Sequence, residues 1–570
     1  MKTALSPHFS QRVIESMSSS PFSLMMDESN DKTDKSCIIL SRFLDPQIGE
    51  VRTRFLDMPV VNIGTAANLF QALNESLAKN GLGFSNAVAF MSDTTNVMKG
   101  KRSGVQKLIR DENPFLLDVG CICHLADLTV KAGLETLPVD IDQLFIDIFY
   151  FFQHSSKRKQ HFVDQWCSMF TTEPDAILKH CPTRWLSILR CVKRYLKQFD
   201  GLRSFFLSCE EAETAKVQSI VARLDNPLTK PLLHFLSFIL PSVDKFNRLF
   251  QKSTQNTTSQ LYDEMNRLVR LYASNFLTAD TILEAGANLK LLKFDASNHL
   301  ANENLGIGTD TWASVSDLEE SEDPALFFNA VRNFYQSSTK KMLVKFPFGD
   351  SLMKDMRLIQ PRHTSSFSVN TVISLATRFP QIGLNDSVSL DRLREEFLDF
   401  KLTPAADLPE IKEYKAADGQ KKPKAGLFWL EVGKMKTMEG QPRFYHLQKL
   451  VSGLMSIPIS NADSERAFSI LRKIHTDQRS NLDHSTVVSL MALKFNLDEC
   501  CLDVELSEEL LKSCKQATKK YVIDLPTRCR LEQAGNSSSD SSSATTASFS
   551  TTDCSSSSAS TSANASGASC

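Results

Sequence analysis

The order of apolar runs near the N-terminus constrains the fold more than any other feature of the sequence. Three short runs follow one another closely, and a helical stretch with apolar residues four apart separates them from two further runs. The predicted strands are residues 22–26, 37–44, 51–60, 87–91 and 115–119, and the predicted helices are 65–79 and a second one around 105–109. Three meandering strands, a crossover helix and parallel strands predict one mixed sheet covered by helices.

This order of elements matches the ribonuclease-H-like arrangement. After residue 125 the strand signals largely vanish, and helical periods take over as far as residue 438. Two polar stretches near 298–324 and 403–424 are predicted loops within that region. We therefore expect an α/β fold in which a ribonuclease-H-like mixed sheet, begun by residues 22–125, is interrupted by a large all-helical insertion, residues 126–438.

The two ends of the chain are assigned from composition. Residues 1–21 are predicted to be an N-terminal leader, and residues 501–534 a C-terminal helix. Residues 535–570 consist mainly of Ser, Thr, Ala and Gly, which cannot bury enough apolar surface to order a chain. We expect this tail to be disordered.

Charge and cysteine content exclude several classes of protein. The formal net charge is −1, so any contact with DNA must come from local basic patches. Thirteen cysteines without regular spacing, and no signal-peptide pattern, indicate reduced thiols in the nucleus or the cytoplasm. The most apolar stretches, residues 144–152 and 231–243, are too short to cross a bilayer, so no membrane partner is expected.

Two aspartates follow predicted strands that lie side by side in a ribonuclease-H-like sheet. Asp27 follows the first strand and Asp93 follows the fourth. Their carboxylates would converge at one sheet edge, and hard divalent cations bind such oxygen ligands. Aspartates at strand ends are also common turn formers, and this remains the alternative.

A C-terminal block gives the strongest family signal. Residues 458–469 read PISNADSERAFS, and the R-x-x-L of residues 479–482 follows them. The block is similar to the C-terminal dimerisation region of hAT transposases. Further motifs occur upstream in the order expected of that family: MMDESND, MSDTTNVMKG, C-x-x-H at 121–124 and TRW at 183–185. The resemblance spans residues 22–496 and assigns residues 439–500 to a dimerisation region that completes the core.

The resemblance implies a catalytic triad of Asp27, Asp93 and Glu465. These three side chains would hold two Mg²⁺ or Mn²⁺ ions for cleavage and strand transfer at DNA phosphodiesters. The helical period supports this, because Glu465 lies opposite the apolar stripe of Ala467, Ile470, Leu471 and Ile474. The alternative is a first-turn glutamate that stabilises the helix dipole.

The resemblance also suggests DNA contacts at Arg184 and Trp185. In hAT enzymes an aromatic residue of the RW motif holds a base swung out of the helix, and Arg184 beside it can bind a phosphate. A core tryptophan on the amphipathic stretch 185–196 is the alternative. The run Lys157–Lys159 and the basic helix with Arg190, Lys193, Arg194 and Lys197 either follow phosphates or form solvated faces.

Cysteine and histidine residues at 121–124 raise the question of a zinc site. Cys121, Cys123 and His124 would need a further ligand, with His180 and Cys181 as candidates, because structural zinc takes four. We do not expect zinc here. Cys121 and His124 are instead predicted to serve packing and hydrogen bonding at the end of the fifth strand.

Self-association is predicted from the last helix of the C-terminal block. Val487, Leu490 and Met491 form an apolar stripe, and Phe468, Val488 and Phe495 add to it. Such a stripe is buried either within the monomer or against a second copy. The resemblance favours a second copy, with Phe468, Val487, Val488, Leu490 and Met491 in the interface of a homodimer or larger assembly.

Two functions are consistent with these features. The first is a DNA transposase that acts on transposon ends. The second is a catalytically silent, domesticated transposase that binds chromatin or other proteins as a dimer. The acidic residues at all three triad positions favour the first, and the absence of a C-x-x-C and H-x-H pattern before residue 22, expected of a BED zinc finger, favours the second. Either function predicts DNA as a partner and the nucleus as the location.

Overall fold

The computed structural model divides the chain into two compact units, Met1–Val504 and Glu505–Cys570, which are described separately. It describes residues 1–30, 34–181, 187–209, 211, 213–251, 257–318, 324–415, 421–479, 481–497 and 506–537. Among these residues, no helix has the length and apolar character needed to cross a membrane.

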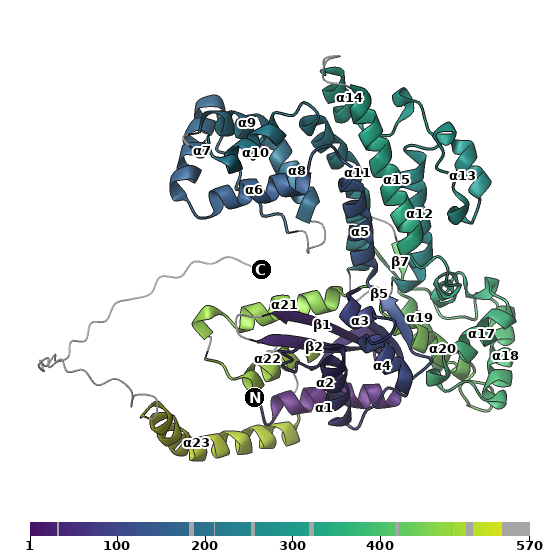
Figure 1. Cartoon of the computed structure of the whole chain (residues 1–570). Helices are drawn as coiled ribbons and strands as arrows, with labels where there is room; N and C mark the ends of the chain where they lie inside the picture. Colours follow the sequence, from purple (N-terminus) through teal and green to yellow (C-terminus); the bar gives the residue numbers. More distant parts are fainter. Residues whose placement is uncertain are drawn as a thin grey trace, which may run out of the picture. The chain divides into compact units, whose positions relative to one another are not determined.

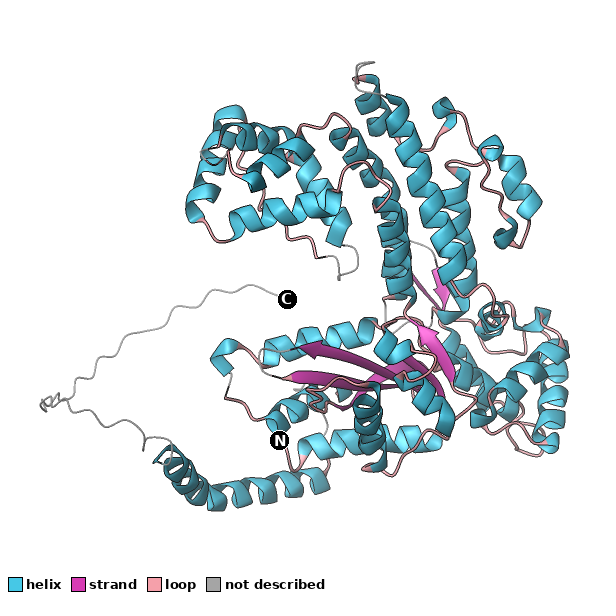
Figure 2. Ribbon diagram, in the orientation of Figure 1, coloured by secondary structure: helices cyan, strands magenta, loops and turns pink. Residues whose placement is uncertain are grey.

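A five-stranded mixed sheet forms the centre of the first unit (Figure 1, Figure 2). Its strands are β1 (Phe22–Asn30), β2 (Lys35–Asp45), β3 (Glu50–Asp57), β4 (Ala87–Ser92) and β5 (Leu117–Gly120). They lie in the order β3-β2-β1-β4-β5. The pairs β1–β2 and β2–β3 are antiparallel, whereas β1–β4 and β4–β5 are parallel. The five predicted strands and the mixed sheet are confirmed.

Both faces of the sheet are covered, as its sequence requires. Strand β4 is buried at every residue, which is typical of a central strand with helices on both sides. Side chains alternate between two apolar clusters: Leu24 and Met26 pack in one, and Met25 packs in the other. The first cluster also contains Leu69, Leu73 and Leu77 of α2 (Ala66–Ala78) and residues of α4 (Val105–Glu112).

The first helix, α1 (Leu5–Ser19), lies within the segment that the sequence suggested as a leader. Its Phe9, Val13 and Met17 are buried, and it packs against β2, β3 and the later helix α22 (His484–Asn496). This helix is therefore part of the folded core. The apolar spacing of four residues in 9–17 is the helical signal that corresponds to α1.

Helices dominate the chain between β5 and residue 438, with short 3₁₀ turns between them. They are α5 (Ile122–Leu134), α6 (Ile141–Gln153), α7 (Ser156–Met169), α8 (Ser187–Lys197), α9 (Phe199–Ser208), α10 (Ala215–Leu224), α11 (Thr229–Phe250), α12 (Leu261–Ser274), α13 (Ala279–Ala285), α14 (Thr309–Ser316), α15 (Pro324–Lys345), α16 (Leu352–Asp355), α17 (Val369–Arg378), α18 (Ser387–Leu402) and α19 (Ala425–Lys434). A further short helix, α3 (Asn96–Lys99), follows β4.

The two predicted loops contain more structure than their composition suggested. Helix α14 lies inside 298–324, where Thr311 and Val315 are buried. Strands β6 (Glu413–Lys415) and β7 (Lys421–Pro423) form a small antiparallel pair inside 403–424. Polar composition marked these stretches as surface segments, but it does not exclude local hydrogen-bonded structure.

The C-terminal block returns to the sheet. Three helices follow the helical region: α20 (Tyr445–Met455), α21 (Ala462–Ile474) and α22. Helix α20 packs on β2, α21 packs on β1 and β2, and α22 packs on β3. The backbone N–H of Ile122 donates to the carbonyl of Ile459 at 3.0 Å. The Asn496 side chain accepts from the N–H of Phe55 at 2.9 Å and donates to its carbonyl at 3.0 Å. Segments more than 300 residues apart in sequence thus share one core.

The second unit contains helix α23 (Glu508–Ser537), so a C-terminal helix is present. The hydroxyl of Ser507 accepts a hydrogen bond from the N–H of Leu510 at 3.2 Å near its start. The predicted disordered tail, 535–570, lies almost entirely outside the described residues.

The Asn496 contact generates the first prediction. Asn496→Ala leaves a buried N–H and a buried C=O of Phe55 without partners, and each such group costs about 1–3 kcal/mol. We expect the free energy of unfolding, measured by urea denaturation, to fall by about 2 kcal/mol or more. The control is Asn68→Ala, at a half-buried asparagine whose hydrogen bond to the carbonyl of Ile63 is exposed to solvent, and for it we expect a change within about 0.5 kcal/mol. Equal losses in the two variants would show that the Asn496 contact does not join α22 to β3.

Candidate active site

Two neighbouring strands bring the predicted aspartates to one edge of the sheet. The parallel pair β1–β4 aligns Met25 with Met91, so Asp27 and Asp93 lie two residues beyond paired positions in the same direction. Strand β1 does not end at Asp27, as the sequence suggested, but continues to Asn30 because it keeps pairing with the long strand β2. Asp93 follows the last residue of β4 directly. Both aspartates are half-buried.

The charge of Glu465 acts on Asp27, one member of this pair. Burial raises the pKa of Asp27 well above its usual value, and the negative charges of Glu465 and then Asp93 raise it further. The N–H of Glu28 donates to Asp27 Oδ1 at 3.0 Å and opposes this shift only in part. The structure therefore brings together all three residues that the sequence singled out.

Asp93 also has the local role that the sequence left open. Its Oδ1 accepts hydrogen bonds from the N–H of Thr95 at 3.2 Å and from the Thr95 hydroxyl at 2.8 Å. These bonds form the turn into α3 and fix the orientation of the carboxyl group. The second oxygen, Oδ2, takes no part in these two bonds. A turn-forming role and an electrostatic role at the sheet edge are thus compatible.

A second acidic residue holds α21 in place, although no pattern in the sequence distinguishes it. Asp463 is buried, and its Oδ2 accepts from the Thr53 hydroxyl at 2.7 Å and lies 3.8 Å from Arg42 Nη1. Its Oδ1 is paired with Arg466, whose guanidinium also donates to the carbonyl of Gln251 at 2.7 Å. At about 100° per residue, Asp463 and Glu465 point to different sides of the helix. The side chain of Asp463 therefore sets the rotation of α21, and exposed Glu465 faces away from Thr53.

A half-buried lysine, Lys99, completes the charges near the edge. Burial lowers the pKa of Lys99, while its ion pair with Asp118 and the charge of Asp93 oppose the shift. Lys99 Nζ also donates to the carbonyl of Val119 at 2.9 Å. This cation lies near Asp93, and nothing in the sequence distinguishes it from an ordinary lysine at the end of a short helix.

The three carboxylates fit a hard divalent cation by chemistry. Mg²⁺ and Mn²⁺ prefer carboxylate oxygens, and a cation would offset the repulsion that raises the pKa of Asp27. The side chains are not closed around a common point, however: over the described ranges no group of three or more His, Cys, Asp or Glu side chains is arranged to hold a metal ion. Asp27, Asp93 and Glu465 are electrostatic neighbours whose oxygens must move together to share an ion.

The cysteines at 121–124 make packing and hydrogen-bonding contacts. Cys121 and Cys123 are buried; Cys121 Sγ accepts from the N–H of Asn461 at 3.3 Å, and Cys123 Sγ donates to the carbonyl of Asn247 at 3.7 Å. Burial lowers the pKa of His124, and the charge of Asp93 opposes this. Each of these contacts joins α5 to a distant segment of the chain.

The other candidate zinc ligands have different neighbours. The His180 ring lies 3.2 Å from Asp142 and 3.0 Å from the hydroxyl of Ser187. The N–H of Cys181 donates to the same hydroxyl at 3.3 Å. In the described structure His180 and Cys181 therefore contact α6 and α8, whereas Cys121 and Cys123 contact α11 and the α20–α21 connection.

The predicted DNA contacts are only partly visible. Arg184 and Trp185 lie outside the described residues. On α8, Arg194 and Lys197 both pair with Asp175, at 3.6 and 2.8 Å, which partly neutralises the basic face expected there. Arg190 and Lys193 are exposed.

The predicted dimer residues are mostly core residues. Phe468, Val487 and Met491 are buried within the chain, at 6%, 4% and 0% exposure, so the expectation that a second copy covers these three side chains is wrong. Val488 and Leu490 are half-buried. Helical periodicity shows that one face is covered but not what covers it, and here the cover is the chain's own core.

Comparison with protein families finds two matching models. The C-terminal dimerisation region of the hAT family matches residues 430–497, which contain Asp463 and Glu465. The ZMYM1/FAM200 RNase-like domain matches residues 1–104, which contain Asp27 and Asp93. The two matched segments are the ones that meet at the sheet.

The raised pKa of Asp27 generates the second prediction. The pKa of the Asp27 carboxyl group is higher in the folded than in the unfolded state. The free energy of unfolding therefore falls as the pH rises from about 4 through the raised pKa. Asp27→Asn removes this cost, so in the presence of a chelator its melting temperature should exceed that of the wild type at neutral pH. The difference should shrink as pH falls towards about 4.

The matched control for this prediction is Asp350→Asn. Hydrogen bonds from Arg378 at 2.7 Å lower the pKa of Asp350, so its contribution to stability is present above the ordinary pKa and is lost at lower pH. Asp350→Asn should therefore be less stable than the wild type at neutral pH. If Asp27→Asn lost stability in the same way, the three carboxylates would not repel one another in the folded protein.

Proposed function

Since the chain is an hAT-like, transposase-derived protein, we propose that its acidic sheet edge catalyses metal-dependent cleavage and strand transfer on DNA. The observation that carries this proposal is the coupling of Asp27 to both Asp93 and Glu465. A carboxyl group that is repelled by two others is costly to the fold, and such costs are typical of functional sites. An hAT dimerisation region within the chain indicates that the protein self-associates.

The three carboxylates act together in this proposal, and other residues position two of them. Asp27, Asp93 and Glu465 would hold two Mg²⁺ or Mn²⁺ ions, which activate the attacking water or 3′-hydroxyl and stabilise the leaving oxygen. Thr95 fixes the carboxyl group of Asp93, and Asp463 fixes the helix that carries Glu465. Asp27 must lose its proton before it can act as a ligand, which its raised pKa opposes until a cation is present.

The contacts of the C-terminal block support a split catalytic domain. Residues 22–125 supply the sheet and two of the carboxylates, and residues 445–496 supply the third and pack on β1, β2 and β3. We propose that the helical region 126–438 is an insertion between these two parts of one ribonuclease-H-like core. The hydrogen bond from Ile122 to Ile459, where the insertion leaves and the chain returns, supports this arrangement.

A catalytically silent dimer that binds chromatin or other proteins is the second candidate. The observation that favours it is the lack of a closed set of metal ligands among the described residues. Self-association and the buried contacts of α21 do not depend on catalysis. For either candidate we propose DNA as the partner and the nucleus as the location, which imaging of the tagged protein would test.

The third prediction tests catalysis. With Mg²⁺ or Mn²⁺, the protein should cleave DNA that bears the terminal repeats flanking its gene, and a chelator should abolish cleavage. Asp27→Asn, Asp93→Asn and Glu465→Gln should each reduce the rate at least about a hundredfold, because each removes a charge that the transition state needs. The matched control, Asp111→Asn, alters an exposed acid paired with Lys107 and should keep the wild-type rate. Cleavage by the three variants at the wild-type rate would contradict the triad, and no cleavage by any protein would favour the silent dimer.

The fourth prediction concerns self-association. Light scattering should report a dimer or larger assembly at a concentration on the order of tens of micromolar. Leu490→Asp should weaken the assembly, because Leu490 is half-buried on α22, while Leu402→Asp, at a leucine 82% exposed on α18, should not. Met491→Ala should instead lower the free energy of unfolding by about 2–5 kcal/mol, because Met491 lies in the core. A monomer throughout would remove self-association from the functional account.

A further inference from the structure

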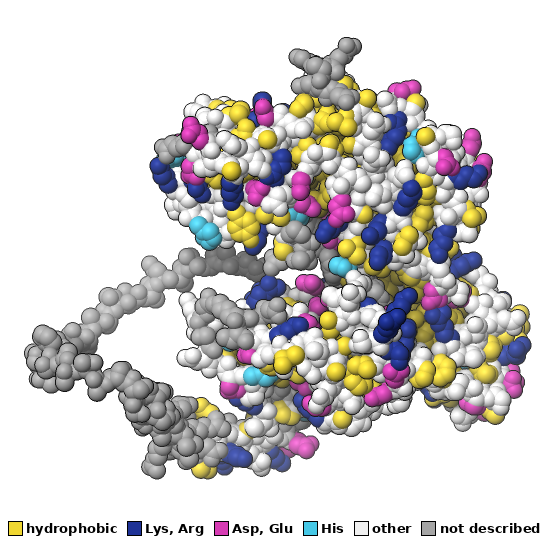
Figure 3. Space-filling view, viewed as in Figure 1, with side chains coloured by type: hydrophobic (Ala, Val, Ile, Leu, Met, Phe, Trp, Pro, Cys, Tyr) yellow, Lys and Arg dark blue, Asp and Glu magenta, His cyan; other side chains and the backbone are white. Residues whose placement is uncertain are grey.

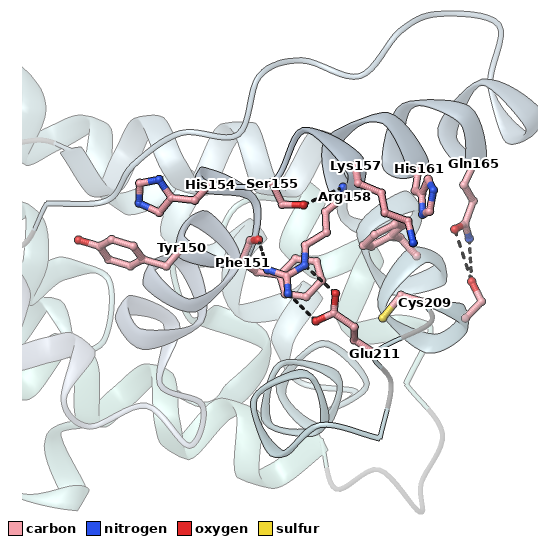
Figure 4. Close-up of a pocket in the computed structure, with 12 residues that line it drawn as sticks. Tyr150, Phe151, His154, Ser155, Lys157, Arg158, His161, Gln165, Cys209 and Glu211 are labelled. Carbon is pink, nitrogen blue, oxygen red and sulfur yellow. Dashed lines mark hydrogen bonds and ion pairs between the residues drawn. The ribbon is translucent and has the colours of Figure 1, made fainter.

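A polar pocket lies in the helical region between the end of α6, the first turns of α7 and the end of α9 (Figure 4). Its volume is about 420 Å³, which is within the range of ligand sites. Tyr150, His154, Lys157, Arg158, His161 and Glu211 are among the residues that line it. We call it the Tyr150 pocket. In Figure 3, basic and histidine side chains occur at the surface of the part formed by α6–α10.

An ion pair between Arg158 and Glu211 forms one wall of this pocket. Arg158 donates to Glu211 through Nε at 2.8 Å and through Nη2 at 2.5 Å, and through Nη1 to the carbonyl of Phe151 at 2.9 Å. Its guanidinium lies 4.3 Å from the centroid of the Phe151 ring. These contacts hold Arg158 in the wall, so its side chain shapes the pocket.

The residues around the opening are positively charged or carry N–H donors. Lys157, His154 and His161 line the pocket and are exposed. Lys157 lies in the first turn of α7, a helix of 14 residues whose N-terminus adds a partial positive charge. Together these groups favour an anion at the opening, and a phosphate group fits both the charge and the donors.

An exposed aromatic ring lies beside these groups. Tyr150 is 45% exposed, and Lys179 Nζ lies 5.5 Å from its ring centroid. An aromatic face next to cationic side chains is how proteins bind unpaired nucleic-acid strands, because the base stacks on the ring while the cations bind the backbone. In a duplex the base faces are already stacked on one another, so this pairing of groups favours a single strand.

We propose that the Tyr150 pocket binds a single strand of DNA, with a base on Tyr150 and a backbone phosphate at Lys157 and the start of α7. The inference deepens the proposed function, and it rests on that function in choosing a nucleic acid over other ligands that carry phosphate. The pocket is built from α6, α7 and α9, none of which carries a carboxylate of the candidate active site. Strand binding and cleavage can therefore be separated by substitution.

The test measures the fluorescence anisotropy of a labelled single-stranded DNA of about 15 nucleotides, on the order of known single-strand site sizes, with the full chain and a chelator present. Tyr150→Ala should weaken binding at least about five-fold, and Tyr150→Phe, which keeps the ring, should bind like the wild type. Lys157→Ala should reduce the slope of log K against log salt by about 0.7, the value for one phosphate contact on a single strand. The matched control is Lys216→Ala, at an exposed lysine on α10 that does not line the pocket, and it should leave the slope unchanged.

Three outcomes would overturn the inference: equal binding by Tyr150→Ala and the wild type, an unchanged salt slope in Lys157→Ala, or full competition by inorganic phosphate or by duplex DNA at the same nucleotide concentration. In an Asp27→Asn background, Tyr150→Ala should weaken strand binding by the same factor as in the wild-type background. Loss of cleavage in Asp27→Asn with this dependence on Tyr150 intact would leave the pocket assigned. If neither the wild type nor any variant cleaves DNA while Tyr150-dependent binding remains, the proposed catalysis is rejected and the inference stands.

Discussion

The attachment of α21 to the sheet is the contact on which the candidate site depends. Asp463 is buried between Thr53 and Arg42, and a buried carboxylate is tolerated only when its charge and its hydrogen bonds are satisfied. That requirement permits one rotation of the helix. Glu465, two residues further on, takes its direction from this rotation, so a structural acid determines where the candidate catalytic acid points.

The same edge carries an electrostatic cost. Asp27 is held in partly buried surroundings near two other acids, and the pKa shift that results is a free-energy penalty for its ionised form. The fold bears this penalty because the apolar clusters on both faces of the sheet, with Leu24 and Met25 on opposite sides, supply the stabilisation. The neighbouring pair Lys99–Asp118 is neutral overall and leaves the repulsion in place.

The sheet could be predicted because its signal is local. Alternating and continuous apolar runs identify strands, and the positions of Asp27 and Asp93 follow from strand order alone. Asp463 could not be found in this way, since nothing in DSER distinguishes an acid that is buried from one that is exposed. The prediction of the dimer residues was wrong for a related reason. The helical period of Val487 and Met491 shows that these side chains are covered, and only the fold shows that the chain itself covers them. Tyr150 was hidden in the run IFYFF, where its exposure depends on the packing of α6.

The distance along the chain between the two halves of the core has a consequence for biosynthesis. Ser23 and Ser456 approach each other with their hydroxyl oxygens 3.4 Å apart, although 433 positions separate them in sequence. At a translation rate of about 5–20 residues per second, the second partner is synthesised roughly 20 to 90 seconds after the first. Throughout that interval β1 and β4 exist without α21, and the third carboxylate has not yet been made. A nascent or prematurely terminated chain thus lacks the complete acidic edge, so the order of synthesis itself keeps the three carboxylates from meeting before α21 has been made.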